Sequence, residues 1–253
     1  EGSEADRLVL LHVVVRQGLA VVEVLRHPVI LEAALARLRE VDATATVTPE
    51  LRCEVAELHL AAYDLHRDPA HLDDAVTALR FALDPPAGFR RLTGEAQDAA
   101  RVALAHALAV RARHGAGPDP AGLHEAEAIA HELTGPEPHA PTGTAVGSLL
   151  VELYRATGEV GYLDDALDAD TPAATEPESA PGLVLRATAL ELRHAAGGDP
   201  ADLDGAIDAA TRAADLLAEG ADGRSSGDEP PEATDRLAVL QTLERLLSRR
   251  HDL

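Results

Sequence analysis

Lysine, asparagine, methionine and tryptophan are absent from this 253-residue chain, and all 22 of its basic residues are arginine. Without lysine the chain can form no Schiff base and offers no P-loop ammonium group, which excludes lysine-dependent aldol, pyridoxal and Walker-type chemistry. Aromatic residues make up only 2% of the chain, whereas 46% of it is hydrophobic. The core must therefore be built mainly from Ala, Leu and Val, which favours closely packed helices over a β-sandwich.

Cysteine and basic charge are also scarce. The single cysteine, Cys53, cannot form an internal disulfide and lies in an apolar helical pattern, which predicts a small core residue rather than a nucleophile. A net charge of -22 argues against a nucleic acid or an anionic membrane as the partner, because binding phosphate needs clustered cations.

Long hydrophobic runs are missing as well. The most apolar stretch, residues 8–25, is interrupted by polar residues, so it is too polar to span a bilayer, and it lacks a signal-peptide cleavage pattern. We therefore expect a cytoplasmic protein that binds neither membrane nor nucleic acid. Since position 1 is not methionine, we also expect the chain to be a processed or excerpted piece.

Four segments share one pattern, in which a ring-bearing residue is followed twelve positions later by a small residue, with a polar break between them. The segments are Tyr63–Ala75, His114–Ala126, Tyr154–Ala166 and His194–Ala206. They begin 51, 40 and 40 residues apart, which is the period at which one supersecondary unit recurs and stacks on its neighbours. In each unit the ring is expected to end a first helix, and the small residue on the second helix is expected to make room for a large side chain on the other, as with Ala75 and Tyr63.

The starts of three second helices are marked by an Asp-Pro pair. Asp is a good N-cap and Pro suits the first helical position. In the third copy Glu159 and Val160 replace the pair, which predicts a softer start. The pattern predicts helices at about 49–66, 69–83, 95–113, 120–133, 141–156, 161–169, 180–196, 200–219 and 232–250.

These elements predict an all-α fold, a right-handed α-solenoid of antiparallel helix pairs with about 10–11 helices. Residues 1–41 are expected to form an N-terminal helical pair, either a cap or a degenerate repeat. Residues 42–219 would hold the repeats, and residues 220–231 a flexible acidic linker. Residues 232–253 would form a C-terminal helix that caps the stack or starts the next repeat.

The repeat resembles a known family. A helix that ends in a ring, a T-G-E or G-D-P break and an L-[DH]-x-A opening of the next helix resemble tetratricopeptide repeats (TPRs) in an elongated form with a period near 40 residues. The resemblance covers residues 50–219 and the last helix. Such units occur in arrays joined to CHAT protease domains or signalling NTPases. The resemblance implies an adaptor that binds peptides or protein segments in a concave groove lined mostly by first helices.

Twelve histidines raise the question of a metal site. His59, His66 and His71 cluster in the sequence, and a site at His59 and His66 would need a third ligand such as Asp64 or His71. The repeat explains others differently, because His114, His194 and His251 occupy the position of the packing ring. The chain has no HExxH, CxxC or Gly-rich phosphate motif, and its acidic pairs lie near helix starts, where carboxylates favour the helix dipole. We therefore expect no resident metal, no cofactor and no catalytic residue.

The leading hypothesis is a non-catalytic scaffold or adaptor that binds a protein or peptide. Candidate partner-binding residues lie on the first helices, where arginine suits contacts with carboxylates. They are Arg52, Glu57, His59, Arg101, His106, Glu152, Arg155, Arg186 and Arg193.

Two alternatives remain open. One is a sensor or regulatory segment of a larger multidomain enzyme, a CHAT-type protease or an NTPase, with catalysis outside this chain. The other is a metal-dependent enzyme that uses the His59 to His71 cluster. In either case the terminal helices could cap the stack or join two copies into a homo-oligomer.

Overall fold

The computed structural model describes residues 33–36, 47–115, 119–134, 143–169, 178–222 and 233–251. This described part of the chain is all-helical, as predicted, and no strand occurs in it. The chain divides into two compact units, Glu1–Pro141 and Thr142–Leu253. The division falls inside the predicted repeat array of residues 42–219, whose bounds stay a prediction. None of the helices described is both long enough and apolar enough to cross a membrane.

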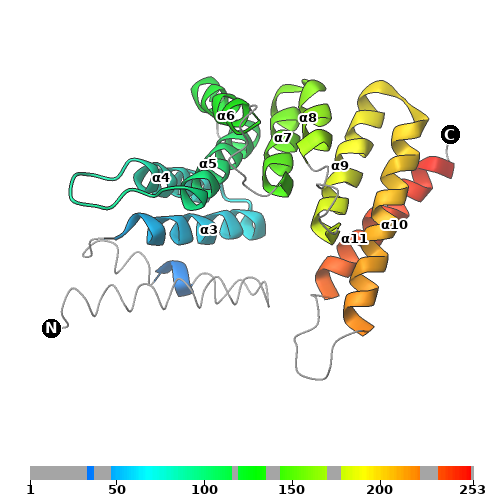
Figure 1. Ribbon diagram of the computed structural model, residues 1–253, viewed down its shortest axis with the longest axis horizontal. Helices are drawn as coiled ribbons and strands as arrows, with labels where there is room; N and C mark the ends of the chain where they lie inside the picture. Colours follow the sequence, from blue (N-terminus) through cyan, green and yellow to red (C-terminus); the bar gives the residue numbers. More distant parts are fainter. Residues whose placement is uncertain are drawn as a thin grey trace. The chain divides into compact units, whose positions relative to one another are not determined.

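The first unit holds four labelled helices: α3 (Pro49–His66), α4 (Pro69–Leu83), α5 (Glu95–His114) and α6 (Pro120–Leu133). Each packs against the next one along the chain, and α3 also contacts α5 (Figure 1). Residues 33–36 form a helical turn. The rest of the predicted N-terminal pair at residues 1–41 lies outside the described residues.

The second unit holds α7 (Gly143–Thr157), α8 (Gly161–Ala169), α9 (Ala180–Gly197), α10 (Pro200–Asp222) and α11 (Ala233–His251). The order of packing is the same, since each helix contacts the next and α7 also contacts α9. Helix α10 continues three residues past its predicted end, into the predicted linker at residues 220–231. The remainder of that linker lies outside the described residues.

The predicted Asp-Pro helix starts are confirmed. In all three, a backbone N–H of the first turn donates to the aspartate Oδ1: Ala70 to Asp68 (3.0 Å), Gly122 to Asp119 (2.9 Å) and Ala201 to Asp199 (2.9 Å). At the third copy, where the pair is missing, α8 opens on a backbone hydrogen bond from Leu163 N–H to Val160 O (2.9 Å). It is also a short helix of nine residues.

The turn after the ring is the same in three of the four copies. Four positions after the ring stand Arg67, Gly158 and Gly198, all with positive φ (57°, 79° and 76°). In each copy the backbone N–H of this residue donates to the carbonyl of the ring residue at 2.7 Å. In the second copy the corresponding residue, Pro118, lies outside the described residues, and Gly115 directly after the ring donates to Arg111 O. The repeated sequence pattern therefore recurs as a repeated local backbone structure.

Opposite substitutions at this turn are expected to have opposite effects. Gly198→Ala should lower the free energy of unfolding by about 1 kcal/mol, because a Cβ is strained at positive φ. Arg67→Gly should raise it by roughly 0.5 kcal/mol, since relief of the same strain outweighs the loss of the arginine's contact with the Tyr63 ring. Urea denaturation followed by circular dichroism measures both effects. A loss of stability for both variants would contradict this explanation of the turn.

The small residue of every copy is a core residue, as predicted. Ala75, Ala126, Ala166 and Ala206 are at most 1% exposed. The leucine three positions earlier is fully buried in three copies and half-buried in the second, where it is Leu123. Close helix packing in this chain therefore rests on the alanine positions and on most of the leucine positions that precede them.

The ring positions differ more than the sequence predicts. Tyr63 is buried and packs with Leu72 of α4 and Val110 of α5. His114 is exposed, with its ring centroid 6.3 Å from that of Tyr63. His194 is half-buried, and its Nδ1 lies 2.7 Å from Asp199 O across the turn. Tyr154 is half-buried and His251 is exposed. Of these five rings, Tyr63 alone belongs to the core.

Candidate interaction surfaces

Most of the predicted partner-binding arginines already have partners within their own unit. The Arg52 guanidinium lies 5.0 Å from the centroid of the Phe81 ring on α4. Arg101 of α5 pairs with Glu132 of α6. Arg155 pairs with Glu152 of its own helix at 2.5 Å. Arg52 covers an aromatic ring, Arg101 joins two helices and Arg155 pairs within its own helix, so their role in binding a partner stays a prediction.

Two further arginines each bridge the helices on both sides of their own. Arg193 of α9 binds Asp164 of α8 (2.7 Å) and Asp202 of α10 (3.0 and 2.6 Å). Arg111 of α5 binds Asp73 of α4 (3.2 Å) and Asp119 at the start of α6 (3.1 and 2.5 Å). Asp73 and Asp164 stand at the same position of the repeat, ten residues after the ring. We call these two arrangements the arginine bridges.

The arginine bridges shift the pKa values of Arg193 and Asp119. Hydrogen bonds that the Arg193 guanidinium donates to Asp202 and then to Asp164 hold the pKa of Arg193 above its ordinary value. The backbone N–H of Gly122, followed by the Arg111 guanidinium, holds the pKa of the Asp119 carboxyl below its ordinary value. Asp119 therefore contributes stability that is complete above the pKa of an unfolded aspartate and is lost as the pH falls through the lowered value.

The remaining predicted residues vary in exposure. Glu57 is exposed, whereas His106 and Arg186 are half-buried. His59 is buried inside unit 1 and is 5% exposed. A buried imidazole cannot face an incoming peptide, so His59 is better explained by its contacts with neighbouring helices.

A cluster of potential metal ligands surrounds His59. Its Nδ1 lies 3.2 Å from Nδ1 of His71, which is 6% exposed, and 3.6 Å from Oδ2 of Asp74. One ligand atom from each of the three residues lies within 4.8 Å of the other two. The sequence offered His71 only as one possible third ligand beside His59 and His66, whereas the imidazole that faces His59 is that of His71. The His66 ring is exposed, with its centroid 6.4 Å from that of His71.

Cys53 does not have the surroundings of a reactive thiol. Burial, and then the nearby carboxylates of Glu57, Glu50 and Glu54, raise the pKa of Cys53 to about 11. The thiol is therefore protonated at neutral pH, and the thiolate is the nucleophilic form. Cys53 is only half-buried, so it is not the core residue that the sequence predicted, but its protonated thiol still argues against a role as a nucleophile.

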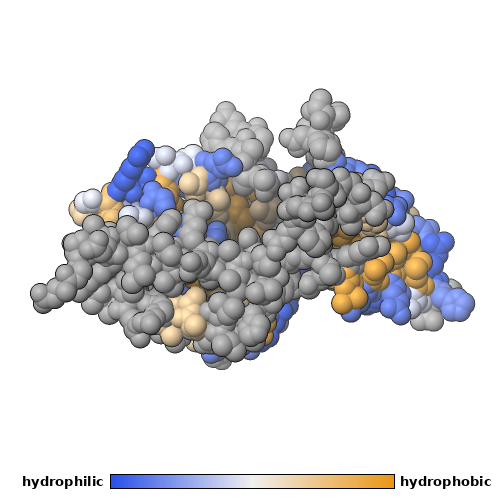
Figure 2. All heavy atoms as spheres, turned by 90° about the horizontal axis from the view of Figure 1, so that it is seen from below, coloured by the Kyte–Doolittle hydropathy of each residue, from blue (hydrophilic) through white to orange (hydrophobic). Residues whose placement is uncertain are grey.

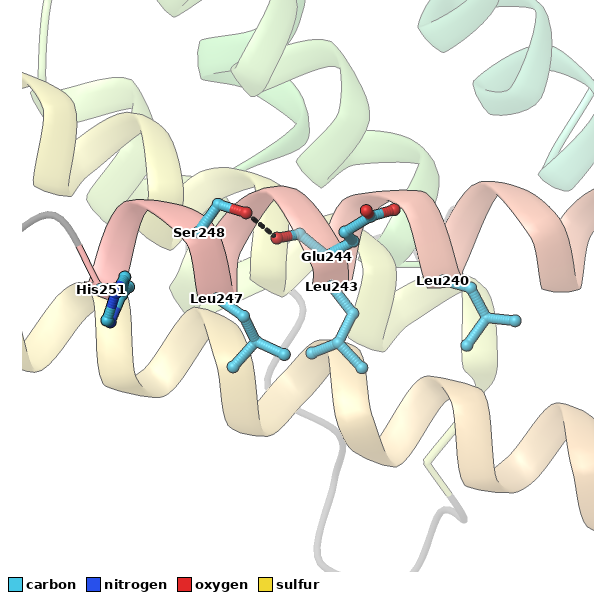
Figure 3. Close-up of a pocket in the computed structure, with 6 residues that line it drawn as sticks. All are labelled: Leu240, Leu243, Glu244, Leu247, Ser248 and His251. Atoms are coloured by element: carbon cyan, nitrogen blue, oxygen red, sulfur yellow. Dashed lines mark hydrogen bonds between the residues drawn. The ribbon is translucent and has the colours of Figure 1, made fainter.

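An apolar surface on α11 was missed by the sequence analysis. Leu237, Leu240 and Leu247 are 55%, 44% and 49% exposed. Figure 3 shows Leu240, Leu243 and Leu247 projecting to the same side of the helix. Figure 2 shows hydrophobic side chains gathered on the surface in the region of α10 and α11. A shallow, open surface site is formed by six residues of α11 alone, and we call it the α11 groove: Leu240, Leu243, Glu244, Leu247, Ser248 and His251.

The sequence of α11 does indicate this surface, because its apolar residues cover a wider arc of the helix than packing against one neighbour requires. Val239 and Leu246, seven residues apart, are buried against the unit. At about 100° per residue, the exposed leucines at 240 and 247 lie roughly a quarter turn around the helix from this buried pair. A helix packed on one side needs only one apolar stripe. Helix α11 carries a second one beside the first.

The position of α11 is fixed by charge as well as by apolar contact. Glu191 of α9 is buried, and its Oε1 accepts from Arg245 (2.7 Å) and Arg249 (2.9 Å) of α11. Arg250 of α11 also pairs with Asp204 of α10. These ion pairs lie on the sides of α11 that face α9 and α10, so the leucines of the groove remain at the surface.

Comparisons with known proteins give no relative, because no protein-family model, no curated protein and no solved structure matches the chain.

Proposed function

We propose that the chain is a non-catalytic, cytoplasmic scaffold built as a right-handed α-solenoid of TPR-like antiparallel helix pairs. Its role is to bind a protein or peptide partner, and the α11 groove receives an amphipathic helix of that partner. The observation that carries the proposal is the second apolar stripe of α11, with leucines about half exposed beside a buried stripe.

The repeat architecture is supported by local structure that recurs at the same positions. Three copies share the positive-φ turn and its 2.7 Å hydrogen bond. The arginine bridges join three consecutive helices in each unit. Each helix packs on the next, and the contacts of α3 with α5 and of α7 with α9 are those expected between the first helices of adjacent pairs. Stacked repeats of this kind present extended surfaces, and their usual work is binding other proteins.

Partner binding through the α11 groove is supported by the cost of leaving leucine in water. Burying the remaining exposed surface of each leucine contributes on the order of 1 kcal/mol. Leucines at 240, 243 and 247 follow the i, i+3, i+7 spacing at which a helix meets another helix. The matching occupant is a partner helix with aliphatic anchors at the same spacing.

The charge of the chain indicates what flanks those anchors. Glu244 is the one carboxylate among the residues that line the groove, three arginines of α11 are paired with Glu191 and Asp204, and the whole chain carries a net charge of -22. Basic residues beside the aliphatic face of the partner would meet this charge and raise the rate of association. We therefore propose a basic amphipathic helix as the occupant, rather than an acidic or extended peptide.

Selection from a display library of helical peptides tests this proposal. The full chain is expected to enrich peptides with aliphatic residues at i, i+3 or i+4, and i+7, flanked by Arg or Lys. Affinity is then measured by calorimetry with one synthetic peptide. Leu240→Glu combined with Leu247→Glu should weaken binding at least about 30-fold, because two apolar contacts worth about 2 kcal/mol are lost and the new carboxylates would have to be desolvated against the aliphatic anchors of the partner.

The matched control is Leu65→Glu on α3, another exposed leucine, which should leave the affinity unchanged. Equal losses in both variants, or no enrichment of amphipathic peptides, would contradict the proposal. Analytical ultracentrifugation of the wild-type chain tests whether a second copy of the chain occupies the groove instead. A dimer that becomes a monomer in the double variant would assign the groove to a second copy of the chain instead.

A further inference from the structure

The cluster of His59, His71 and Asp74 joins two helices of unit 1 at a place that partner binding by α11 does not use. His59 comes from α3, whereas His71 and Asp74 are three residues apart on one face of α4. Both histidines are more than nine-tenths buried, and the Asp74 carboxylate lies at the surface beside them. The fold thus directs two imidazole nitrogens and one carboxylate oxygen toward a common point.

The facing nitrogens of the two imidazoles can share either a proton or a cation. Their Nδ1 atoms lie 3.2 Å apart, so one must donate and the other accept, or both must face a shared cation. A hydrogen bond between neutral rings requires no third group. The Asp74 Oδ2 nevertheless lies 3.6 Å from the Nδ1 of His59, which adds a negative charge and a third ligand atom at the same point. A cation accounts for all three positions.

The spacing also fits a metal. Zn²⁺ binds imidazole nitrogen and carboxylate oxygen at about 2.0–2.2 Å, so neighbouring ligands of a tetrahedral ion lie about 3.3–3.5 Å apart. The separations of 3.2 and 3.6 Å measured from His59 are close to this value. The third separation, between His71 and Asp74, is within 4.8 Å and can close by rotation of the exposed carboxylate.

We propose that His59, His71 and Asp74 bind one Zn²⁺ ion that links α3 to α4. Two imidazoles and a carboxylate form a ligand set that Zn²⁺ uses in proteins, unlike the all-oxygen sets of Mg²⁺ and Ca²⁺. A water molecule or the exposed imidazole of His66 completes the tetrahedron. This site is independent of the α11 groove and holds whether or not that groove binds a partner.

Titration with Co²⁺, which reports its geometry in the visible spectrum, tests the site. The full chain is first treated with chelator and then titrated. We expect one equivalent of Co²⁺ to bind with the intense visible absorption of a tetrahedral complex, and Zn²⁺ to displace it. His71→Ala should weaken the affinity at least about 100-fold, since even outer-shell partners of metal ligands are worth 10–100-fold.

Two further variants keep the test decisive if His71→Ala disturbs folding. Asp74→Asn keeps the size of an exposed side chain, so the metal-free variant should fold with the circular dichroism spectrum of the wild type while Co²⁺ binding weakens at least about 10-fold. His124→Ala on α6, also an exposed residue, is the matched control and should bind Co²⁺ like the wild type. Absence of binding, an octahedral spectrum, or an Asp74→Asn affinity equal to that of His124→Ala would overturn the site.

Discussion

Leu72→Ala is expected to lower the free energy of unfolding of unit 1 by about 3 kcal/mol. The side chain is fully buried and belongs to the cluster with Tyr63 and Val110, which joins three consecutive helices. Its removal loses the transfer energy of the deleted methyl groups and leaves a cavity that the neighbouring helices fill only in part. Urea denaturation followed by circular dichroism measures the change in the full chain.

The repeat provides its own control at Leu123, which stands at the same position in the second copy. Leu123 is only half-buried, so Leu123→Ala should cost about 1 kcal/mol. Both substitutions lie in unit 1 and remove the same atoms. Equal costs at the two positions would show that burial of the leucine does not determine its contribution to stability.

The second large effect concerns the buried carboxylate beneath α11. Replacing Arg245 and Arg249 together with glutamine is expected to cost about 3 kcal/mol, because Glu191 would keep a buried charge with no cation beside it. The cost lies at the lower end of the range for buried pairs, since both arginines are about half exposed. Hydrogen exchange followed by mass spectrometry should show faster exchange in α11 than in the wild type.

Removing the carboxylate as well should restore most of the stability. In the triple variant with Glu191→Gln, the buried group is neutral and can hydrogen bond to a neighbouring amide. The difference between the double and triple variants isolates the uncompensated charge. A triple variant that is no more stable than the double variant would attribute the loss to packing of the arginine stems instead.

Local signals in the sequence were sufficient to predict the helices. Asp68, Asp119 and Asp199 accept from the first-turn amides as an N-cap should, and the helices after them begin where the Asp-Pro pairs predict. The small positions of the repeat were predictable for the same reason, since an alanine recurring at one place in a helix pattern indicates close packing. Both features depend on a few neighbouring residues.

Features that depend on contacts between distant segments were not predictable. The sequence offered Arg193 as a groove residue, whereas it bridges Asp164 and Asp202 on the two adjacent helices. It grouped His59, His66 and His71 and offered His71 only as one possible third ligand beside His59 and His66, whereas the imidazole that faces His59 is that of His71. The exposed stripe of α11 was missed because periodicity shows which residues are apolar, not which of them a neighbouring helix covers.

The most direct test of the central claim is hydrogen exchange of the full chain with and without a peptide enriched from the display library. Binding in the α11 groove predicts slower exchange in residues 237–251 of α11, and no such change in the Leu240→Glu and Leu247→Glu double variant. Slower exchange confined to the first helices around Arg52 or Arg101, with exchange in α11 unchanged, would contradict the claim. It would instead favour binding in the concave groove that the sequence predicted.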